Sequence, residues 1–222
     1  MKFLECAQFD SINQFLDHLD LGKSTINGSL EAYICKHSGT DRKISFSLEH
    51  EILSWMGQSS DCEASSPASS LSTKSSRKTL IYLILTLNHM YPDYDFSAVQ
   101  AHLFFRDEEW NSFKQMFEIY MFEAAEEWAL SNGDVSLLES ICKAIDDVVK
   151  LDDCDIYSYN PDIHGDPFSE EGSIWSSHFF FYNKKLKRVV SIRLCCLSNS
   201  AMGGFLSDQS DADEVIFTDM DM

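Results

Sequence analysis

The chain has 222 residues, 44% of them hydrophobic, and its 36 acidic and 17 basic side chains give a formal charge of −19. This composition is typical of a globular protein, and the length fits one domain with or without mobile segments. The charge argues against direct binding of nucleic acid, because such binding depends on lysine and arginine contacts with phosphates. An acidic protein is attracted instead to basic surfaces of other macromolecules, including surfaces that hold nucleic acid.

Neither the first residues nor the cysteines indicate secretion. Glu5 lies where a signal peptide needs apolar residues, and the longest apolar run, 80–87, is too short to cross a bilayer. The seven cysteines form no Cys-x-x-Cys pair, which favours small buried thiols in a reducing compartment. We therefore expect a soluble protein with no membrane partner.

The N-terminal third predicts a short helix followed by a β-hairpin. Asp10 precedes apolar residues at helical spacing, and Gly22 can end that helix in a left-handed turn. Alternating apolar residues then predict strands over 26–35 and 44–48, joined by a turn at 38–41.

Residues 57–79 interrupt this pattern. Nine of these 23 residues are serine, and Leu71 is the only large aliphatic residue among them. Such a segment buries too little apolar area to offset the entropy of ordering it. We predict a single domain over 1–205 that is interrupted by a disordered serine-rich insert at 57–79.

Helices are predicted to follow the insert. The apolar run 78–90 fits a buried helix, although 79–87 also fits a strand. A capping box at 97–100 then predicts a helix toward Phe105.

One long helix is predicted over 107–129 from an apolar stripe at helical spacing. Lys114 is the only basic side chain in this range, so the opposite face should form a negative ridge. We predict a partner-facing acidic surface at Glu118, Glu123, Glu126 and Glu127. A further helix is predicted after Gly133, as far as Val148.

The last third predicts strands. Aromatic and β-branched runs over 156–159, 174–182 and 186–197 favour strands, with a turn at 183–185. The second strand is apolar at both alternating sets of positions near its end, so it should be covered on both faces. The predicted fold class is therefore α+β, with a central antiparallel β-sheet and helices packed on both faces as an α/β/α sandwich. Residues 206–222 hold six acidic and no basic side chains, which predicts a disordered acidic tail.

Motifs for phosphate, metal and nucleophile chemistry are incomplete. A P-loop-like ending at 22–24 lacks its first glycine, because Asp17 stands there. His164 lies between aspartates in a segment whose prolines and glycine favour a polar turn. The acidic pairs 146–147 and 152–153 fit solvated surface. We predict no enzyme activity, no metal and no cofactor.

A basic run stands out because the region 173–207 contains no acidic residue. Its side chains are Lys184, Lys185, Lys187 and Arg188. Three interpretations remain open: a soluble hairpin turn, a nuclear import signal, or a contact surface for an acidic partner.

Three aromatic-rich blocks occur in order along the chain. They are Tyr-Pro-Asp-Tyr-Asp-Phe-Ser at 91–97, Asp-Ile-Tyr-Ser-Tyr-Asn-Pro-Asp at 155–162, and Trp-Ser-Ser-His-Phe-Phe-Phe-Tyr-Asn-Lys-Lys-Leu-Lys-Arg-Val-Val at 175–190. At this spacing the chain resembles the Maf family, the eukaryotic repressors of RNA polymerase III transcription. A weaker N-terminal block lies at 9–13, and the resemblance includes the place of the serine-rich insert.

The resemblance implies a non-catalytic protein that moves between nucleus and cytoplasm. It implies binding to RNA polymerase III near its clamp, which prevents productive association with the TFIIB-related initiation factor. It also implies that nutrient-dependent kinases of TOR signalling phosphorylate the insert and hold the protein inactive. Phosphatases acting under stress would then free it for the nuclear import machinery.

Candidate phosphorylation sites lie within the insert. Ser66 precedes a proline, and Ser75 and Ser76 lie beside basic residues. The other candidates are Ser59, Ser60, Ser69 and Ser70. Each phosphate adds a charge of about −1.5 to −2, so two would reverse the sign of the insert. We hypothesise that a phosphorylated insert pairs with 77–78 or with the turn at 184–188, against the alternative of an unmodified linker.

Two other functions compete with repression. An antiparallel sheet flanked by helices can enclose an apolar pocket lined by the aromatic run 179–182, which suits a small-molecule-sensing domain, and the charge suits a general acidic mimic of nucleic acid. A monomer is expected, because no heptad repeat or self-complementary edge is visible.

Overall fold

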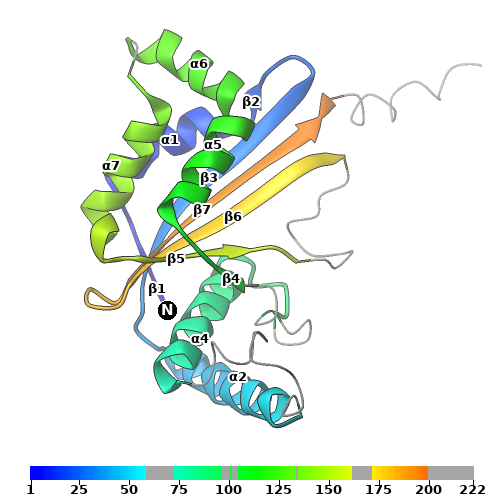
Figure 1. Ribbon diagram of the computed structural model, residues 1–222, viewed down its shortest axis with the longest axis vertical. Coiled ribbons are helices and arrows are strands. Elements are labelled where there is room, and N and C mark those ends of the chain that lie inside the picture. Colours follow the sequence, from blue (N-terminus) through cyan, green and yellow to red (C-terminus); the bar gives the residue numbers. More distant parts are fainter. Residues whose placement is uncertain (59–72, 97–100, 102–104, 134, 162–171, 200–222) are drawn as a thin grey trace, which may run out of the picture.

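A computed structural model gives the fold of residues 1–58, 73–96, 101, 105–133, 135–161 and 172–199 (Figure 1). Its helices are α1 (Ala7–Leu16), α2 (Gly39–Gln58), α4 (Lys74–Met90), α5 (Trp110–Tyr120), α6 (Phe122–Asn132), α7 (Leu137–Val149) and the short 3-10 helix η2 (Leu151–Asp153). Its strands are β1 (Lys2–Leu4), β2 (Leu19–Asp20), β3 (Ser24–Ile34), β4 (Phe105–Glu108), β5 (Asp155–Tyr159), β6 (Ser173–Asn183) and β7 (Arg188–Ser198).

The strands form one antiparallel sheet in the order β1-β3-β7-β6-β5-β4, with β2 paired to β3. The long strands β3 and β7 pair along their whole length, from Ser24 opposite Ser198 to Ile34 opposite Arg188. The three strands predicted in the last third are confirmed as β5, β6 and β7, and a tight turn joins the last two. The strand predicted at 26–35 is confirmed as β3, but it pairs with β1, β2 and β7 and not with residues 44–48.

Helices cover both faces of this sheet, which confirms the predicted α/β/α arrangement. Figure 1 shows α1, α5, α6 and α7 on one side of the strands and α2 with α4 on the other. Side chains alternate accordingly along β6: Phe179 and Phe181 pack in one hydrophobic cluster, and Phe180 and Tyr182 pack in the other. The prediction that this strand is covered on both faces is therefore confirmed.

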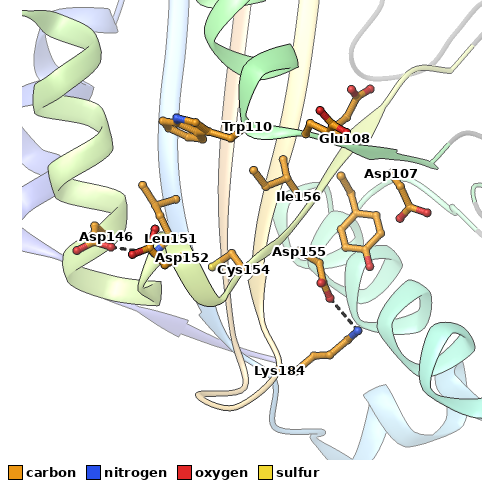
Figure 2. A pocket seen from close by; sticks show the side chains of 12 residues that line it. Asp107, Glu108, Trp110, Asp146, Leu151, Asp152, Cys154, Asp155, Ile156 and Lys184 are labelled. Atoms are coloured by element: carbon orange, nitrogen blue, oxygen red, sulfur yellow. Dashed lines mark hydrogen bonds and ion pairs between the residues drawn. The ribbon is translucent and has the colours of Figure 1, made fainter.

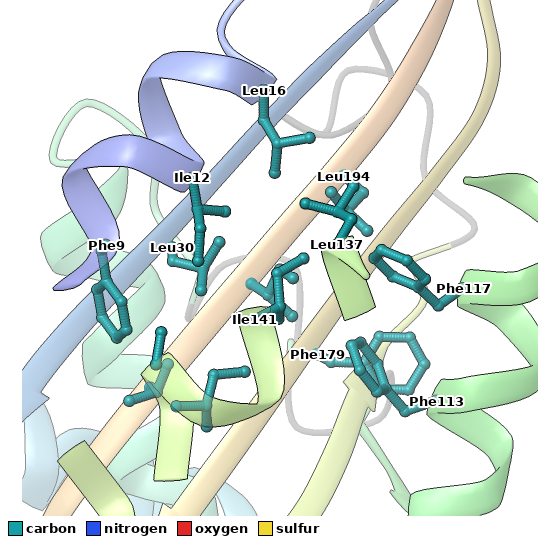
Figure 3. Close-up of a cluster of buried hydrophobic side chains, with 14 of the residues drawn as sticks. Phe9, Ile12, Leu16, Leu30, Phe113, Phe117, Leu137, Ile141, Phe179 and Leu194 are labelled. Carbon is teal, nitrogen blue, oxygen red and sulfur yellow. The ribbon is translucent and has the colours of Figure 1, made fainter. Parts of the chain in front are cut away.

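The larger cluster joins α1, α5 and α7 to the sheet (Figure 3). Phe113 is fully buried there and makes edge-to-face contacts with Phe179 and Phe181, at centroid distances of 5.2 Å and 5.3 Å. Gly28 lets α1 approach the strands closely, because a Cβ atom on it would lie 2.9 Å from a methyl carbon of Leu194 and 3.1 Å from Leu16. The larger cluster therefore holds α5 and α7 against the sheet.

The strand predicted at 44–48 is wrong, because these residues lie inside α2. The supposed turn is a capping box. The Asp41 N–H donates to Ser38 Oγ at 3.2 Å, and the Ser38 N–H donates to Asp41 Oδ2 at 2.7 Å. Leu48 and Ile52, one helical turn apart, are buried, whereas Phe46 is 75% exposed. The alternation of apolar residues therefore did not reflect a buried strand face.

The boundaries predicted for the insert also need correction. Helix α2 continues to Gln58, and α4 begins at Lys74, so both ends of the predicted 57–79 segment are helical. Thr73 caps α4 by accepting a hydrogen bond from the Ser76 N–H at 3.1 Å. Residues 59–72 lie outside the described residues. The helix predicted from residue 78 is confirmed as α4, and the strand alternative is wrong.

The single helix predicted over 107–129 is instead a strand and two helices. Asp107 and Glu108 belong to β4, and α5 and α6 meet at Met121, which is buried. The following helix is confirmed as α7, although Ser136 caps it, accepting from the Glu139 N–H at 3.3 Å. The predicted capping box at 97–100, the turn around His164 and the tail at 206–222 lie outside the described residues.

Candidate interaction surfaces

An open groove of about 950 Å³ lies where β4, β5, η2 and the β6–β7 turn meet (Figure 2). Lys184 is the only lysine or arginine among its described lining residues. We call this surface the acidic groove, after the carboxylates that line it: Asp107, Glu108, Glu109, Asp146, Asp152 and Asp155. Its other lining residues are Trp110, Leu151, Cys154, Ile156 and Tyr157.

The end of α7 brings these carboxylates together. Lys150 adopts a left-handed conformation with φ of 57°, and Asp146 Oδ1 accepts a hydrogen bond from the Leu151 N–H at 2.8 Å. The chain therefore turns sharply into η2 and then into β5. Antiparallel pairing sets Asp107 of β4 opposite Tyr157 of β5, so acids from distant parts of the sequence share one surface.

The groove contains no activated nucleophile among its described lining residues. Burial raises the pKa of the Cys154 thiol to about 12, and the nearby Asp155, Asp153 and Asp146 carboxylates act in the same direction. Burial, with help from Asp155 and Asp107, also raises the pKa of Tyr157 well above its ordinary value. Both side chains therefore stay protonated at neutral pH. The thiol is inert as a nucleophile.

The groove is instead suited to hold cationic side chains. Carboxylates accept charge-assisted hydrogen bonds from guanidinium and ammonium groups. Trp110 and Tyr157, which also line the groove, offer aromatic rings that attract cations. The arrangement can therefore bind lysine and arginine side chains of a partner.

The basic run lies at the edge of this groove and is partly neutralised there. Lys184 Nζ is 2.8 Å from Asp155 Oδ2, and Lys185 Nζ is 2.6 Å from Asp153 Oδ1. Arg188 Nη1 donates to the carbonyl of residue 148 at 3.0 Å, which ties β7 to α7.

The remaining member, Lys187, is exposed and adopts a positive φ of 53° in the β6–β7 turn. Its carbonyl accepts a hydrogen bond from the Cys35 N–H at 2.8 Å. The four residues therefore do not form one block of free positive charge.

The predicted acidic residues Glu118, Glu123, Glu126 and Glu127 are all exposed on α5 and α6. Large apolar side chains are exposed among them: Ile119 by 70%, Phe122 by 61% and Leu130 by 80%. We call these seven residues the α5–α6 surface. Trp110 begins α5 at the acidic groove, and this surface starts near the other end of the same helix, about 12 Å away along its axis.

The candidate phosphorylation sites divide into two groups. Ser75 and Ser76 lie in the first turn of α4, where Ser75 is exposed and the Ser76 Oγ is 2.8 Å from Thr73 Oγ1. They therefore belong to a helix and not to the predicted disordered segment. The other candidates, Ser59, Ser60, Ser66, Ser69 and Ser70, lie outside the described residues.

Sequence reasoning missed the acidic groove as a unit. The pairs 146–147 and 152–153 were visible in the sequence, but they fit solvated surface equally well, and their nearness to 107–109 depends on β4 pairing with β5. In the part of the chain that the structure describes, no three His, Cys, Asp or Glu side chains form a metal-binding group. None of the described helices is both long enough and apolar enough to cross a bilayer.

Comparison with known proteins gives a consistent result. Residues 26–193 match the family model described as the Maf1 regulator. The Schizosaccharomyces pombe protein named repressor of RNA polymerase III transcription maf1 is 32% identical over 212 residues, covering 91% of this chain and 86% of that protein. A Dictyostelium discoideum protein named repressor of RNA polymerase III transcription is 27% identical over 235 residues, covering 86% of this chain and 82% of that protein.

Solved structures agree with the fold. Two crystal structures of citrus MAF1, in different space groups, are 61% and 62% identical to this chain, with TM-scores of 0.74 and 0.75. They cover 87% and 86% of this chain, and the matches extend over 100% and 99% of theirs.

Proposed function

The chain belongs to the Maf1 regulator family, and from that premise we propose that it represses transcription by RNA polymerase III. The family model describes a regulator, and the relatives from S. pombe and D. discoideum are named repressors of this polymerase. The match covers 86% and 82% of these two relatives.

The acidic groove is the structural observation that carries this proposal. A polymerase binds nucleic acid through basic surfaces. A groove lined by six carboxylates, whose lining lysine is already paired to Asp155, is complementary to such a surface. Complementary charge accelerates association and sets orientation. We infer that the groove contacts basic side chains of the polymerase near its clamp and so hinders the TFIIB-related initiation factor.

The α5–α6 surface supplies a second contact of a different kind. Its exposed Phe122 and Leu130 can be desolvated by a partner, which gives affinity that salt does not screen. Its glutamates reinforce the match to a basic partner. Repression would therefore combine a salt-sensitive contribution from the groove with a salt-resistant contribution from these helices.

Control of the repressor is proposed to act through the serine-rich segment. Nutrient-dependent kinases would phosphorylate it, phosphatases would reverse this, and import machinery would carry the dephosphorylated protein from cytoplasm to nucleus. The support is its composition, since seven of the fourteen residues from 59 to 72 are serine. Ser75 and Ser76 are weaker candidates, because they lie within the first turn of α4.

The test is a reconstituted transcription reaction with purified, dephosphorylated protein. A tRNA template read by RNA polymerase III and a messenger-type template read by RNA polymerase II are transcribed in parallel at two salt concentrations. Selective loss of the tRNA transcript at both concentrations is expected. Equal loss on both templates that disappears at higher salt would indicate a general acidic mimic and contradict the proposal.

A further inference from the structure

A second hollow, of about 380 Å³, lies between α2 and α4 and shares no lining residue with the acidic groove. Arg42, Lys74 and Lys78 line it, and Glu49 is the only carboxylate among its described lining residues. His37, Ser45, Phe46 and Ile81 complete the lining. We call this site the α2–α4 hollow. Its charge is opposite in sign to the formal charge of −19 of the whole chain.

Helical spacing places these cations on the helix faces that border the hollow. Lys74, Lys78 and Ile81 follow one another by four and three residues on α4, and so lie on one helix face. Arg42 and Phe46 have the same relation on α2. The two helices pack against each other, so both faces border the same hollow.

The cations of the hollow are available to a ligand. Arg42, Lys74 and Lys78 are exposed, and within the described ranges none of them forms an ion pair with a carboxylate. Lys184 and Lys185, by contrast, are each paired with an aspartate. Among the described residues, these three cations are therefore not paired with a carboxylate.

The pKa of His37 depends on the charged side chains of the hollow. Its ring lies 5.0 Å from the ring of Tyr82. Burial lowers the pKa of His37 below its ordinary value; Asp41 opposes this, and the amino terminus, Lys78 and Arg42 lower it further. The Asp41 carboxylate is itself held by the amino terminus and by a histidine of α4. An anion bound beside these cations would raise the pKa of His37.

The chemistry of the hollow suits a phosphate monoester. Such a group carries a charge of about −1.5 to −2 at neutral pH and presents oxygens to several donors at once. Arginine and lysine side chains form strong charge-assisted hydrogen bonds with it. Three cations around one hollow can therefore hold one dianion.

We propose that the α2–α4 hollow binds a phosphoserine carried by this chain's own segment 59–72, at Ser69 or Ser70. This rests on the phosphorylation proposed above and gives it a docking site. The segment joins α2 to α4 and ends beside Lys74, which lines the hollow. Five residues of extended chain reach about 17 Å, so both serines can place a phosphate there.

Attachment of the phosphoserine to the same chain favours its binding to the hollow. A ligand attached by a short flexible linker experiences an effective concentration in the millimolar range, so even weak phosphate binding is populated. Free phosphate must compete against that concentration. The same chemistry can accept a separate phosphorylated molecule, and the experiment distinguishes this second source.

The test measures the pKa of His37 by NMR in the full chain, with His37→Gln used to assign its signal. Phosphoserine is incorporated genetically at Ser70 in one sample and at Ser59 in another. Ser59 follows α2 directly, and Gln58 lies about 24 Å along the helix axis from Arg42, so its phosphate adds the same charge outside the hollow. A third sample carries phosphoserine at Ser70 with Lys74→Gln and Lys78→Gln, and circular dichroism checks its folding.

Phosphoserine at Ser70 is expected to raise the pKa of His37 by about one unit, and phosphoserine at Ser59 by a small fraction of that. The Lys74→Gln and Lys78→Gln variant should lose most of the shift. Inorganic phosphate should raise the pKa of His37 in the unmodified chain but not further in the chain phosphorylated at Ser70.

Three results would overturn the proposal: equal shifts from both phosphoserines, no shift from either, or an undiminished response of the Ser70-phosphorylated chain to added phosphate. The last would show that the hollow takes a free anion. No polymerase is present, so failure here leaves repression untouched. Failure of the transcription test likewise leaves the pKa of His37 unaffected.

Discussion

The ammonium group of Lys184 lies 2.8 Å from a carboxylate oxygen of Asp155, and this pair closes one side of the acidic groove. Lys185 makes the corresponding contact with Asp153 at 2.6 Å. All four side chains are at least 46% exposed, so each pair stabilises the fold by less than about 1 kcal/mol. The main effect of the two pairs is therefore on binding, because they reduce the number of lysines in the basic run that are free to contact a receptor.

Freeing the two lysines tests the import interpretation of the basic run. Asp153→Asn with Asp155→Asn removes both partners, so the nuclear fraction of the protein should rise. The measurement is fluorescence microscopy of a fusion at the C-terminus, because the amino group of Met1 is buried against Asp41. Glu5→Gln with Asp10→Asn makes the same change of charge at exposed sites elsewhere. Equal nuclear fractions in all three proteins would contradict a role in import.

Phe113→Ala should reduce the free energy of unfolding by about 3 to 5 kcal/mol. The ring is fully buried and packs edge-to-face against Phe179 and Phe181, so its removal leaves a cavity between α5 and the sheet. Ile119→Ala on the same helix changes a side chain that is 70% exposed and should cost less than about 0.5 kcal/mol. Urea unfolding measures both. Similar losses for the two variants would mean that α5 is not packed as described.

His178 should make the fold less stable in acid. Its burial, with a smaller effect of Arg193, lowers the pKa from 6.5 to about 3, so the unfolded chain binds a proton that the folded chain does not. Its contribution is complete above pH 6.5 and is lost as the pH falls toward 3, by at most about 1.4 kcal/mol per pH unit.

Replacing this side chain should flatten that dependence. In His178→Gln the free energy of unfolding is expected to fall less steeply between about pH 6 and pH 4 than in the parent protein. His18→Gln is the control, because the His18 side chain is 77% exposed. Denaturant unfolding at a series of pH values supplies the slopes. Parallel slopes for His178→Gln and the parent would refute the assignment of this titration to His178.

Leu130→Ala should weaken repression most clearly at high salt. Leu130 is 80% exposed on α6 and lies one helical turn from Glu126, so it can serve as an apolar anchor within an acidic surface. Leu53→Ala is the matched control, since Leu53 is 46% exposed on α2 and lines neither the groove nor the hollow. The concentration for half-maximal repression should rise several-fold for the first variant and stay constant for the second. Equal effects would remove α6 from the interface.

The sequence predicted the sheet well where periodicity and burial agree. The run 179–182 is apolar at every position, and that pattern identified a strand covered on both faces. The strand prediction failed at 44–48. The apolar residues there alternate as in a strand, but they lie in α2, which buries Leu48 and leaves Phe46 exposed. The capping box at 38–41 was the available indication of a helix.

The break between α5 and α6 could not be predicted from the apolar stripe. Phe117, Met121 and Ala124 keep helical spacing through the junction, and the Met121 N–H still donates to the Phe117 carbonyl at 2.9 Å. The spacing of apolar residues therefore does not show that the chain changes direction between α5 and α6. The α2–α4 hollow was missed for a related reason, since Arg42 lay between the predicted turn and the predicted strand, and Lys74 lay in the predicted insert.

The acidic groove depends on tertiary structure alone. Asp107, Asp152 and Lys184 meet only because β4 pairs with β5 and because α7 ends in a left-handed turn. No local pattern in the sequence encodes that meeting. The charge of the chain predicted a basic partner, but not the surface that binds it.

The most direct test of the central claim compares groove variants in the reconstituted tRNA transcription reaction. Three exposed groove acids are neutralised together by Asp107→Asn, Glu109→Gln and Asp152→Asn. Three exposed acids outside the groove are neutralised in the control by Glu5→Gln, Asp10→Asn and Asp17→Asn. The net charge is then the same in both proteins.

The groove variant should need about ten times more protein for half-maximal repression than the control, since three contacts of about 0.5 kcal/mol each give that factor. The control should match the parent protein at equal ionic strength. Equal potency of the two variants would contradict repression through the acidic groove.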